Sequence, residues 1–236
     1  MYKKILTFSL FLSLFFTNSL FANKDIKMLD EQQQNIITIS AFTATGELDR
    51  LENALNEGLD SGLTINEIKE IFAHLYAYVG FPRSLNAQNL FMKVVENRKK
   101  IGKEDIEGKK ASPKPEGYDS IEYGKKIRAK LAGLKEDYTG APYQVFSPVI
   151  DEYLLGHLFG DIFVRDILDH KTRELVTISA LASLLGTQGQ LNFHFKASMN
   201  AGLTKEQLKD FIKVIDHKVD SKQAKLSSET LEKVLN

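Results

Sequence analysis

The sequence of 236 residues contains no cysteine. It can therefore form no disulfide, and it supplies neither a thiolate nucleophile nor a thiolate ligand for a metal ion. It also lacks a glycine-rich phosphate-binding loop, a nucleophile elbow and a histidine pair with the H-E-x-x-H spacing of zinc sites. No stretch alternates between apolar and polar residues for long enough to predict a β-strand. We therefore expect an all-α protein with no bound metal ion and no cofactor.

Neither sign of charge is in excess, with 31 basic and 31 acidic residues. The first 22 residues hold two of the lysines and no acid, so the rest of the chain has a net charge of −2. A chain without a positive excess has no electrostatic basis for binding nucleic acid or an anionic membrane surface. We expect neither partner.

The N-terminus has the pattern of a secretory signal peptide. Lys3 and Lys4 precede an apolar run from Ile5 to Phe16, and a more polar segment then ends at Ala22. The apolar run is too short for a comfortable membrane span. We expect residues 1–22 to be cleaved after Ala22 and the protein to be exported to the periplasm, without membrane contact after cleavage. The alternative is an uncleaved N-terminal anchor.

The rest of the chain contains one pattern twice. The first copy has Leu-Asp at 29–30, Thr-Ile-Ser-Ala at 38–41 and Gly-Leu-Thr at 62–64, and the second has them at 168–169, 177–180 and 202–204. The offset is 139 residues at first and 140 later, so one residue was gained or lost between the copies. Such self-similarity predicts a duplicated structural unit. Polar residues present in only one copy are then candidates for function.

Both copies have helical spacing. Leucines at 48, 51, 55 and 59 mark one helix face, and Thr64-x-x-Glu67 and Thr204-x-x-Gln207 have the form of capping boxes at helix starts. Gly80 and Pro82 predict a break between two helices. We expect a first helical repeat over residues 23–97 and a second over 148–236. Residues 98–147 are expected to form a charged linker and a connecting helix (118–134), with a loop over 142–148.

Glu174 is the strongest chemical candidate. It lies four residues before Ile178 and seven before Leu181, which places its carboxylate on or beside the apolar face of a helix. A buried carboxylate is costly unless it is paired, and such a group suits general acid or base catalysis. The first copy has Asn35 at the matching position, and Arg173 corresponds to Gln34.

His194 is the second candidate. It follows Leu191 by three residues and precedes Ser198 by four, so it shares a face with apolar and small side chains. Its counterpart in the first copy is Ala54. A lone histidine there could be a packed core residue. A histidine and a carboxylate that are both specific to one copy could equally form a catalytic pair.

Further polar candidates are His74, Arg83 and Asn86 in the first copy, and Arg165 just before the second. Guanidinium groups pair well with carboxylates, so Arg165 and Arg173 are candidates for binding a carboxylate ligand.

Four segments resemble the carboxymuconolactone decarboxylase family, part of the alkylhydroperoxidase-like superfamily. Residues 168–180 (LDHKTRELVTISA) resemble the family's L-D-x-K-T-R-E-L-x-x-I-A segment, 159–165 (FGDIFVR) resemble F-G-D-x-x-x-R, 191–204 resemble L-x-x-H followed by G-L-T, and 74–87 (HLYAYVGFPRSLNA) resemble H-x-A-x-Y-x-G-x-P-x-x-x-N-A of two-copy members. The resemblance implies duplicated antiparallel helical repeats, a ring-like homo-oligomer (trimer or hexamer) and an active site near subunit interfaces.

The resemblance also implies one of two chemistries. The first is decarboxylation of 4-carboxymuconolactone, and the second is alkylhydroperoxide reduction by a C-x-x-C pair four residues before a histidine. Gly189 to Phe193 precede His194 here without a cysteine, so thiol peroxidase chemistry is excluded. Glu174 and His194 match the family's acid–base positions.

Two hypotheses follow. In the first, the chain is a cofactor-free lyase for a small carboxylic acid or lactone: Arg173 or Arg165 holds the carboxylate, Glu174 and His194 move a proton, and His74, Arg83 and Asn86 complete the pocket. In the second, the chain is a non-catalytic ligand-binding or assembly protein, with Glu174 paired to Arg173 and His194 packed. A catalytic pair should line one open pocket, whereas structural residues should be apart or sealed.

Overall fold

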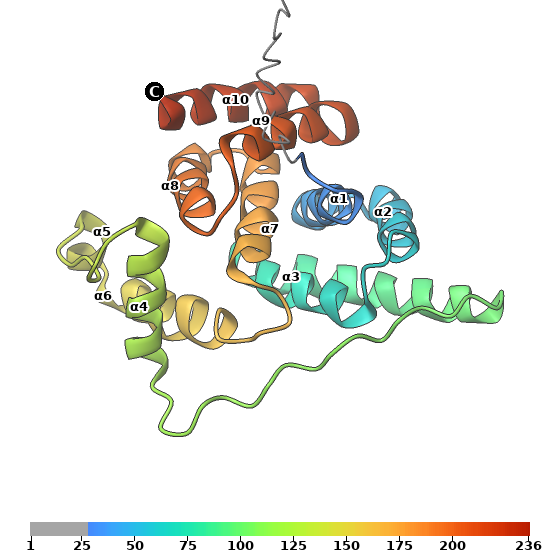
Figure 1. The fold of residues 1–236 in the computed structure, drawn as a ribbon, viewed down its shortest axis with the longest axis horizontal. Coiled ribbons are helices and arrows are strands. Elements are labelled where there is room, and N and C mark those ends of the chain that lie inside the picture. The colour runs from blue at the N-terminus through green and yellow to red at the C-terminus, as the bar shows by residue number, and fades with distance from the viewer. Residues whose placement is uncertain (1–27) are drawn as a thin grey trace, which may run out of the picture.

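The computed structural model describes residues 28–236, and the expected signal peptide over residues 1–22 lies outside this part. The regular structure of residues 28–236 is helical throughout (Figure 1), as the sequence predicts. In chain order the elements are α1 (Glu31–Thr45), α2 (Leu48–Asp60), α3 (Ile65–Lys100), α4 (Ser120–Ala132), α5 (Pro142–Phe146), α6 (Pro148–Tyr153), the π-helical η1 (Leu154–Ile162), α7 (His170–Ser183), α8 (Gln188–Asn200), α9 (Lys205–Val214), the π-helical η2 (Ile215–Val219) and α10 (Ser221–Leu235).

The duplicated pattern forms equivalent helices. Asp30 and Asp169 cap α1 and α7, with Oδ1 accepting from the third backbone N–H of each helix at 2.9 and 2.7 Å. Thr64 and Thr204 begin α3 and α9, and both form the capping boxes that the sequence predicts. The repeats thus share their helix starts, where the side chain itself determines the local backbone.

Gly80 interrupts α3, as its sequence position indicates. Its φ of 76° and ψ of 163° are non-helical, so α3 consists of two helical segments that meet at this residue. A side chain in this left-handed region of φ would be strained. The second segment starts with Pro82 in its first turn, where a missing backbone N–H costs no hydrogen bond.

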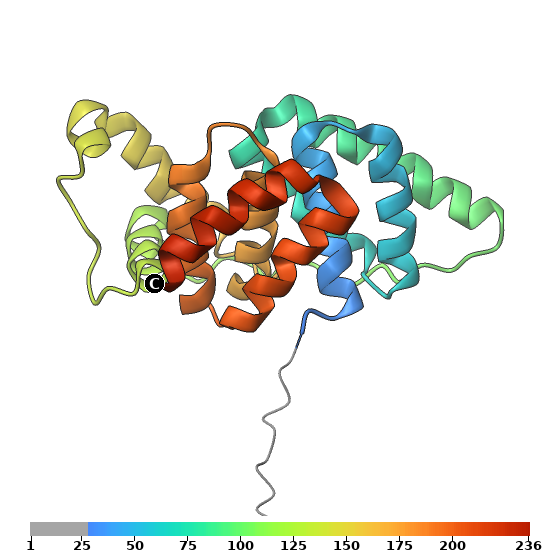
Figure 2. The same cartoon turned by 90° about the horizontal axis from the view of Figure 1, so that it is seen from above.

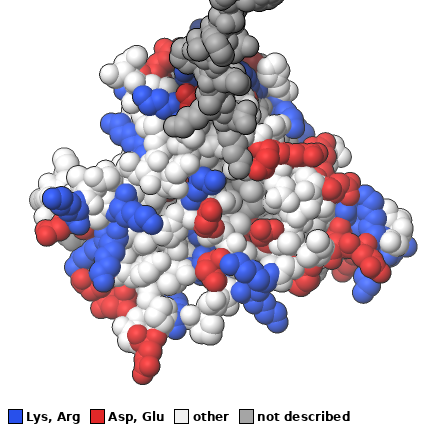
Figure 3. All heavy atoms as spheres, in the orientation of Figure 1, with Lys and Arg blue, Asp and Glu red and all other residues white. Residues whose placement is uncertain are grey.

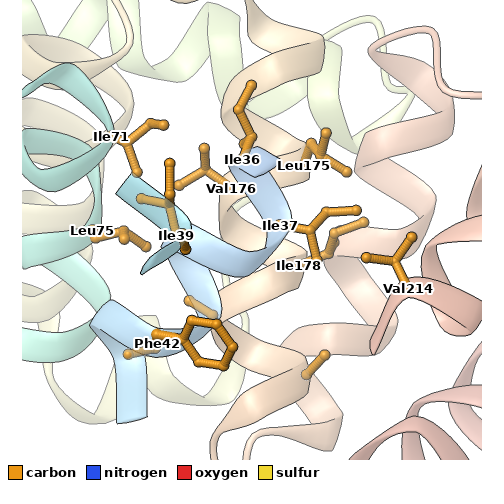
Figure 4. Packing of buried hydrophobic residues seen from close by; sticks show 14 of the residues in the cluster. Ile36, Ile37, Ile39, Phe42, Ile71, Leu75, Leu175, Val176, Ile178 and Val214 are labelled. Carbon is orange, nitrogen blue, oxygen red and sulfur yellow. The ribbon is translucent and has the colours of Figure 1, made fainter. Parts of the chain in front are cut away.

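The hydrophobic core lies where the two repeats meet. Helix α1 packs against α7 at the centre of the molecule, and all residues of α1 from Asn35 to Ala44 are buried. Figure 4 shows the isoleucines of α1 packed against Val176 and Ile178 of α7, with side chains of α3 and α9 beside them. α9 and α10 cover one end of α7 and α8 (Figure 1). The shared core holds α7, the helix of Glu174, in place from several sides.

Helix α4 packs closely on η1 through two glycines. A Cβ on Gly124 would lie 2.0 Å from the carbonyl oxygen of Leu155, and one on Gly160 would lie 2.5 Å from that of Ser120. Ile127, Leu131 and Leu158 form part of a smaller second core here. The connecting helix expected over residues 118–134 is present as α4, which packs against η1 and α8.

Two features of the connecting region differ from the sequence-based expectation. The loop expected over residues 142–148 contains α5, which starts at Pro142, a residue suited to the first turn of a helix. Arg98, expected in an exposed linker, is buried and paired with Asp105 at 2.6 Å and Asp60 at 2.8 Å. These partners are distant in sequence or in an irregular segment, so periodicity could not reveal them.

The two ends of the molecule are formed by the last turns of α3 and by α5 with α6 (Figure 2). On the face drawn in Figure 3, acidic and basic side chains are interspersed. None of the helices in residues 28–236 combines the length and apolar character that crossing a membrane requires.

Candidate acid–base site

Glu174 and His194 are in direct contact. Glu174 lies in the second turn of α7 and His194 in the middle of α8, and Nδ1 of His194 is 2.8 Å from Oε2 of Glu174. Glu174 is 0% exposed and His194 6%. The repeat comparison thus selected two residues that form a buried carboxylate–imidazole pair.

Two polar atoms in and beside this pair lack hydrogen-bond partners in the described part of the chain. Oε1 of Glu174 and Oη of Tyr78 are buried and have no hydrogen-bond partner within residues 28–236. The Tyr78 ring lies against both His194 and His74, with centroid separations of 5.8 and 5.4 Å. Burial, and secondarily the charge of Glu174, raises the pKa of Tyr78 well above its ordinary value. Tyr78 therefore retains its proton, and its hydroxyl lies near Thr177 without forming a hydrogen bond of normal geometry.

His74 belongs to the same cluster and is neutral. The Thr177 hydroxyl donates to the carbonyl of Arg173 at 2.9 Å, so it accepts a hydrogen bond from Nε2 of His74 at 2.8 Å. Nη1 of Arg173 then donates to Nδ1 of His74 at 3.4 Å. Burial, followed by the nearby Arg173 and His194, lowers the pKa of His74 well below its usual value. The uncharged ring is held by donors and acceptors on both sides.

Arg173 and Arg165 are both bound to Glu70. Arg173 is 0% exposed and donates from Nη2 to Oε1 of Glu70 and to the carbonyl of Arg165, each at 2.7 Å. Arg165 donates to both oxygens of Glu70, and its side chain is 43% exposed. Burial raises the pKa of Glu70, but hydrogen bonds from Arg165 and Arg173 outweigh it and lower the pKa below its ordinary value. The expected structural pair between Arg173 and Glu174 is therefore replaced by one between Arg173 and Glu70.

Arg83 and Asn86 lie outside this cluster. Both are exposed on the second segment of α3, and Arg83 donates to the carbonyl of Ala44 at the end of α1. Neither residue hydrogen-bonds to Glu174, His194 or His74. The structure thus brings together His74, Arg165, Arg173, Glu174 and His194 of the seven candidates.

The pair is closed off within one chain. A cleft of about 450 Å³ opens beside the first turn of α7 and is lined by Phe163 and Arg165, among others, but not by Glu174 or His194. Glu174 and His194 are thus adjacent but sealed, and they do not line an open pocket as a catalytic pair was expected to do. Residues 28–236 also bring no three His, Asp or Glu side chains together in a metal-binding arrangement.

Three residues of the cluster were not predicted: Glu70, Tyr78 and Thr177. Glu70, His74 and Tyr78 are spaced by four residues, which places them along one face of α3. That spacing alone could have predicted that these three polar side chains lie on one face of a helix. Their partners on α7 lie about a hundred residues away, for example 103 for Glu70 and Arg173, so helical spacing could not pair them.

The fold and the site define a class: an all-α protein of two helical repeats, with a buried carboxylate–imidazole pair in the second. A sequence model of the carboxymuconolactone decarboxylase family matches residues 15–91 and 148–220, which together make up more than half of the chain. The chain belongs to this family. The two matched regions overlap the two repeats, although the first match begins at residue 15, and both lie outside residues 98–147.

A curated relative agrees with this assignment. The chain is 34% identical to the 4-carboxymuconolactone decarboxylase of Acinetobacter baylyi over 67 aligned residues. The aligned region makes up 28% of this chain and 49% of the relative. The chain thus spans about half the length of the curated relative that it matches.

Proposed function

We propose that the protein is a cofactor-free lyase that removes CO2 from a small carboxylic acid or lactone, with Glu174 and His194 as its proton-transfer pair. The 2.8 Å contact between Nδ1 of His194 and Oε2 of Glu174 carries this proposal. Membership of the family and the similarity to a 4-carboxymuconolactone decarboxylase support the type of reaction. The corresponding residues of the first repeat, Asn35 and Ala54, cannot form such a pair.

The proposed chemistry uses the two ring nitrogens of His194 differently. When CO2 leaves, the electron pair of the broken carbon–carbon bond stays on the substrate carbon as an enolate, which then needs a proton. Nε2 of His194 has no hydrogen-bond partner within residues 28–236 and can supply that proton. Glu174 holds Nδ1, orients the ring and stabilises the imidazole while it is protonated.

The other cluster residues act through this pair. Arg173 and Arg165 are bound to Glu70, so we assign them to positioning α7 rather than to binding the substrate carboxylate. Tyr78, which lies against His194, is a donor for a developing oxyanion, because its buried hydroxyl forms no hydrogen bond of normal geometry within residues 28–236. Neutral His74 also contacts the Tyr78 ring.

His194 is only 6% exposed in the single chain, so a substrate can reach it only if the surrounding structure differs from that of the single chain. We propose that the site is completed in an exported homo-oligomer, a trimer or hexamer as the family resemblance implies. Oε1 of Glu174 and Oη of Tyr78, which lack partners within residues 28–236, would be paired by a substrate that reaches this site.

The experiment is turnover of 4-carboxymuconolactone and related lactones and carboxylic acids by the purified protein. Glu174→Gln and His194→Gln should each reduce kcat by about 100-fold or more, the size of a general acid–base contribution. The matched control is His157→Gln, because His157 forms a second carboxylate–histidine contact, with Asp161 at 3.4 Å, on the exposed surface. Unchanged kcat in the Glu174 and His194 variants would refute the assignment.

The burial of the pair favours a second candidate, a non-catalytic ligand-binding or assembly protein that keeps the family scaffold. Under this alternative the wild type turns over none of the substrates. Glu174→Gln and His194→Gln would then affect only stability, which unfolding measurements on the same variants would show.

A further inference from the structure

The cleft beside the first turn of α7 has the features of a ligand site separate from the acid–base pair. Its volume of about 450 Å³ lies within the range of about 300–1,000 Å³ that is usual for small-molecule sites. Side chains from four parts of the chain meet there: α4, the segment between η1 and α7, the start of α7, and the C-terminal end of α8.

The lining of the cleft is more basic than acidic, with Lys130, Arg165 and Lys171 against Asp166 and Asp169. Lys130 and Lys171 line it from α4 and α7, and neither forms an ion pair within residues 28–236. The two acidic lining residues are already engaged. Asp166 accepts hydrogen bonds from the backbone N–H and hydroxyl of Ser112 at 2.9 and 2.8 Å, and Asp169 caps α7. An anion could therefore bind the two lysines without competing against an existing carboxylate partner.

The remaining lining side chains include two aromatic rings. Tyr123 is half-buried on α4, and Phe163, which is 2% exposed, closes the inner side. His170 packs edge-on against Phe163 with a centroid separation of 5.6 Å. Burial, followed by the charges of Lys130 and Arg173, lowers the pKa of His170, so the ring is neutral at neutral pH. Aromatic side chains beside two lysines suit a flat ring that carries a carboxylate.

Phe163 separates this cleft from the acid–base pair. Its ring contacts His74 at 5.5 Å, the His74 ring contacts Tyr78 at 5.4 Å, and Tyr78 contacts His194 at 5.8 Å, all measured between centroids. Three consecutive ring contacts thus connect the inner side of the cleft to His194. A ligand in the cleft cannot touch His194 while these rings keep their places.

We propose that this cleft binds a small aromatic monocarboxylate, with the carboxylate between Lys130 and Lys171 and the ring against Tyr123 and Phe163. Binding of this ligand does not depend on binding of the substrate of Glu174 and His194. Phe163, the inner side of the cleft, also contacts His74 and lies 5.9 Å from the Arg173 guanidinium.

The test is isothermal titration of the full-length protein with benzoate at low ionic strength. Lys130→Gln combined with Lys171→Gln should raise the benzoate Kd by about tenfold or more, because two charge-assisted contacts are lost. The matched control is Lys126→Gln, an exposed lysine on α4 that does not line this cleft. The control should bind benzoate as the wild type does. Absence of benzoate binding, or equal weakening in the control, would overturn the proposal.

Two further titrations test the ligand class and the location. Cyclohexanecarboxylate and inorganic phosphate should bind more weakly than benzoate, and equal affinity for either would refute the role of the aromatic residues. Glu174→Gln should leave the benzoate Kd unchanged. A large increase in that variant would place the ligand at the acid–base pair and refute a separate site. These binding results stand whether or not the protein has decarboxylase activity.

Discussion

Replacing Glu70 by glutamine tests the buried ion cluster that joins α3 to α7. The glutamine keeps the shape of the side chain but removes the negative charge that Arg173, at 0% exposure, has within hydrogen-bond distance. Removing one partner of a buried ion pair typically costs about 3–5 kcal/mol, because the other charge stays buried without compensation. Arg165 adds little to this value, since its side chain is 43% exposed and solvent screens it.

We therefore expect Glu70→Gln to lower the free energy of unfolding by about 3 kcal/mol, the lower end of this range, since the amide can still accept one hydrogen bond. For a chain of this size that corresponds to a decrease in Tm of roughly 6–12 °C. Urea unfolding followed by far-UV circular dichroism measures the change. The control is Glu122→Gln, which breaks the exposed pair with Lys125 and should have no measurable effect.

The pH dependence gives a second measurement on the same variant. Because the folded-state pKa of Glu70 is lowered, its stabilisation is present above about pH 4.5 and is lost as the pH falls through the folded-state value. The unfolding free energy of Glu70→Gln should therefore decrease less on acidification than that of the wild type. A loss below about 1 kcal/mol at neutral pH, with parallel pH curves, would refute a tight ion cluster.

Three other substitutions have expected outcomes in unfolding measurements. Gly124→Ala should destabilise the protein by about 1–3 kcal/mol or more, because its Cβ meets the Leu155 carbonyl at 2.0 Å. Gly189→Ala, a helical glycine with open space around it, should instead stabilise it by up to about 1 kcal/mol, and a loss there would contradict the packing argument. Tyr78→Phe should change stability by less than about 1 kcal/mol, since the buried hydroxyl has no partner to lose, and a larger loss would show a hydrogen bond in solution.

The pairing of Glu174 with His194 could be predicted because both lie on faces fixed by helical spacing and both are absent from the other repeat. The inference rested on the first repeat having Asn35 and Ala54 at the positions that match Glu174 and His194. The helix starts at Thr64 and Thr204 could be predicted for a similar reason, since a capping box involves residues only three apart.

The partner of Arg173 could not be predicted in this way. Arg173 and Glu174 are neighbours in sequence, yet successive residues of a helix point about 100° apart, so they face different sides of α7. Glu70 reaches Arg173 only because α3 packs against α7. Burial of the pair from solvent also depends on tertiary packing, which a single helix pattern does not contain.

Deuterium transfer from solvent to product tests the central claim most directly. If Glu174 and His194 deliver the proton that replaces CO2, a substrate that the protein decarboxylates in D2O gains one deuterium at the carbon that lost CO2. NMR measures the rate of this deuterium incorporation. The account predicts that His157→Gln matches the wild type, while Glu174→Gln and His194→Gln lose about 100-fold or more in both CO2 release and deuterium transfer. Deuterium transfer at the wild-type rate in either of these two variants would contradict it.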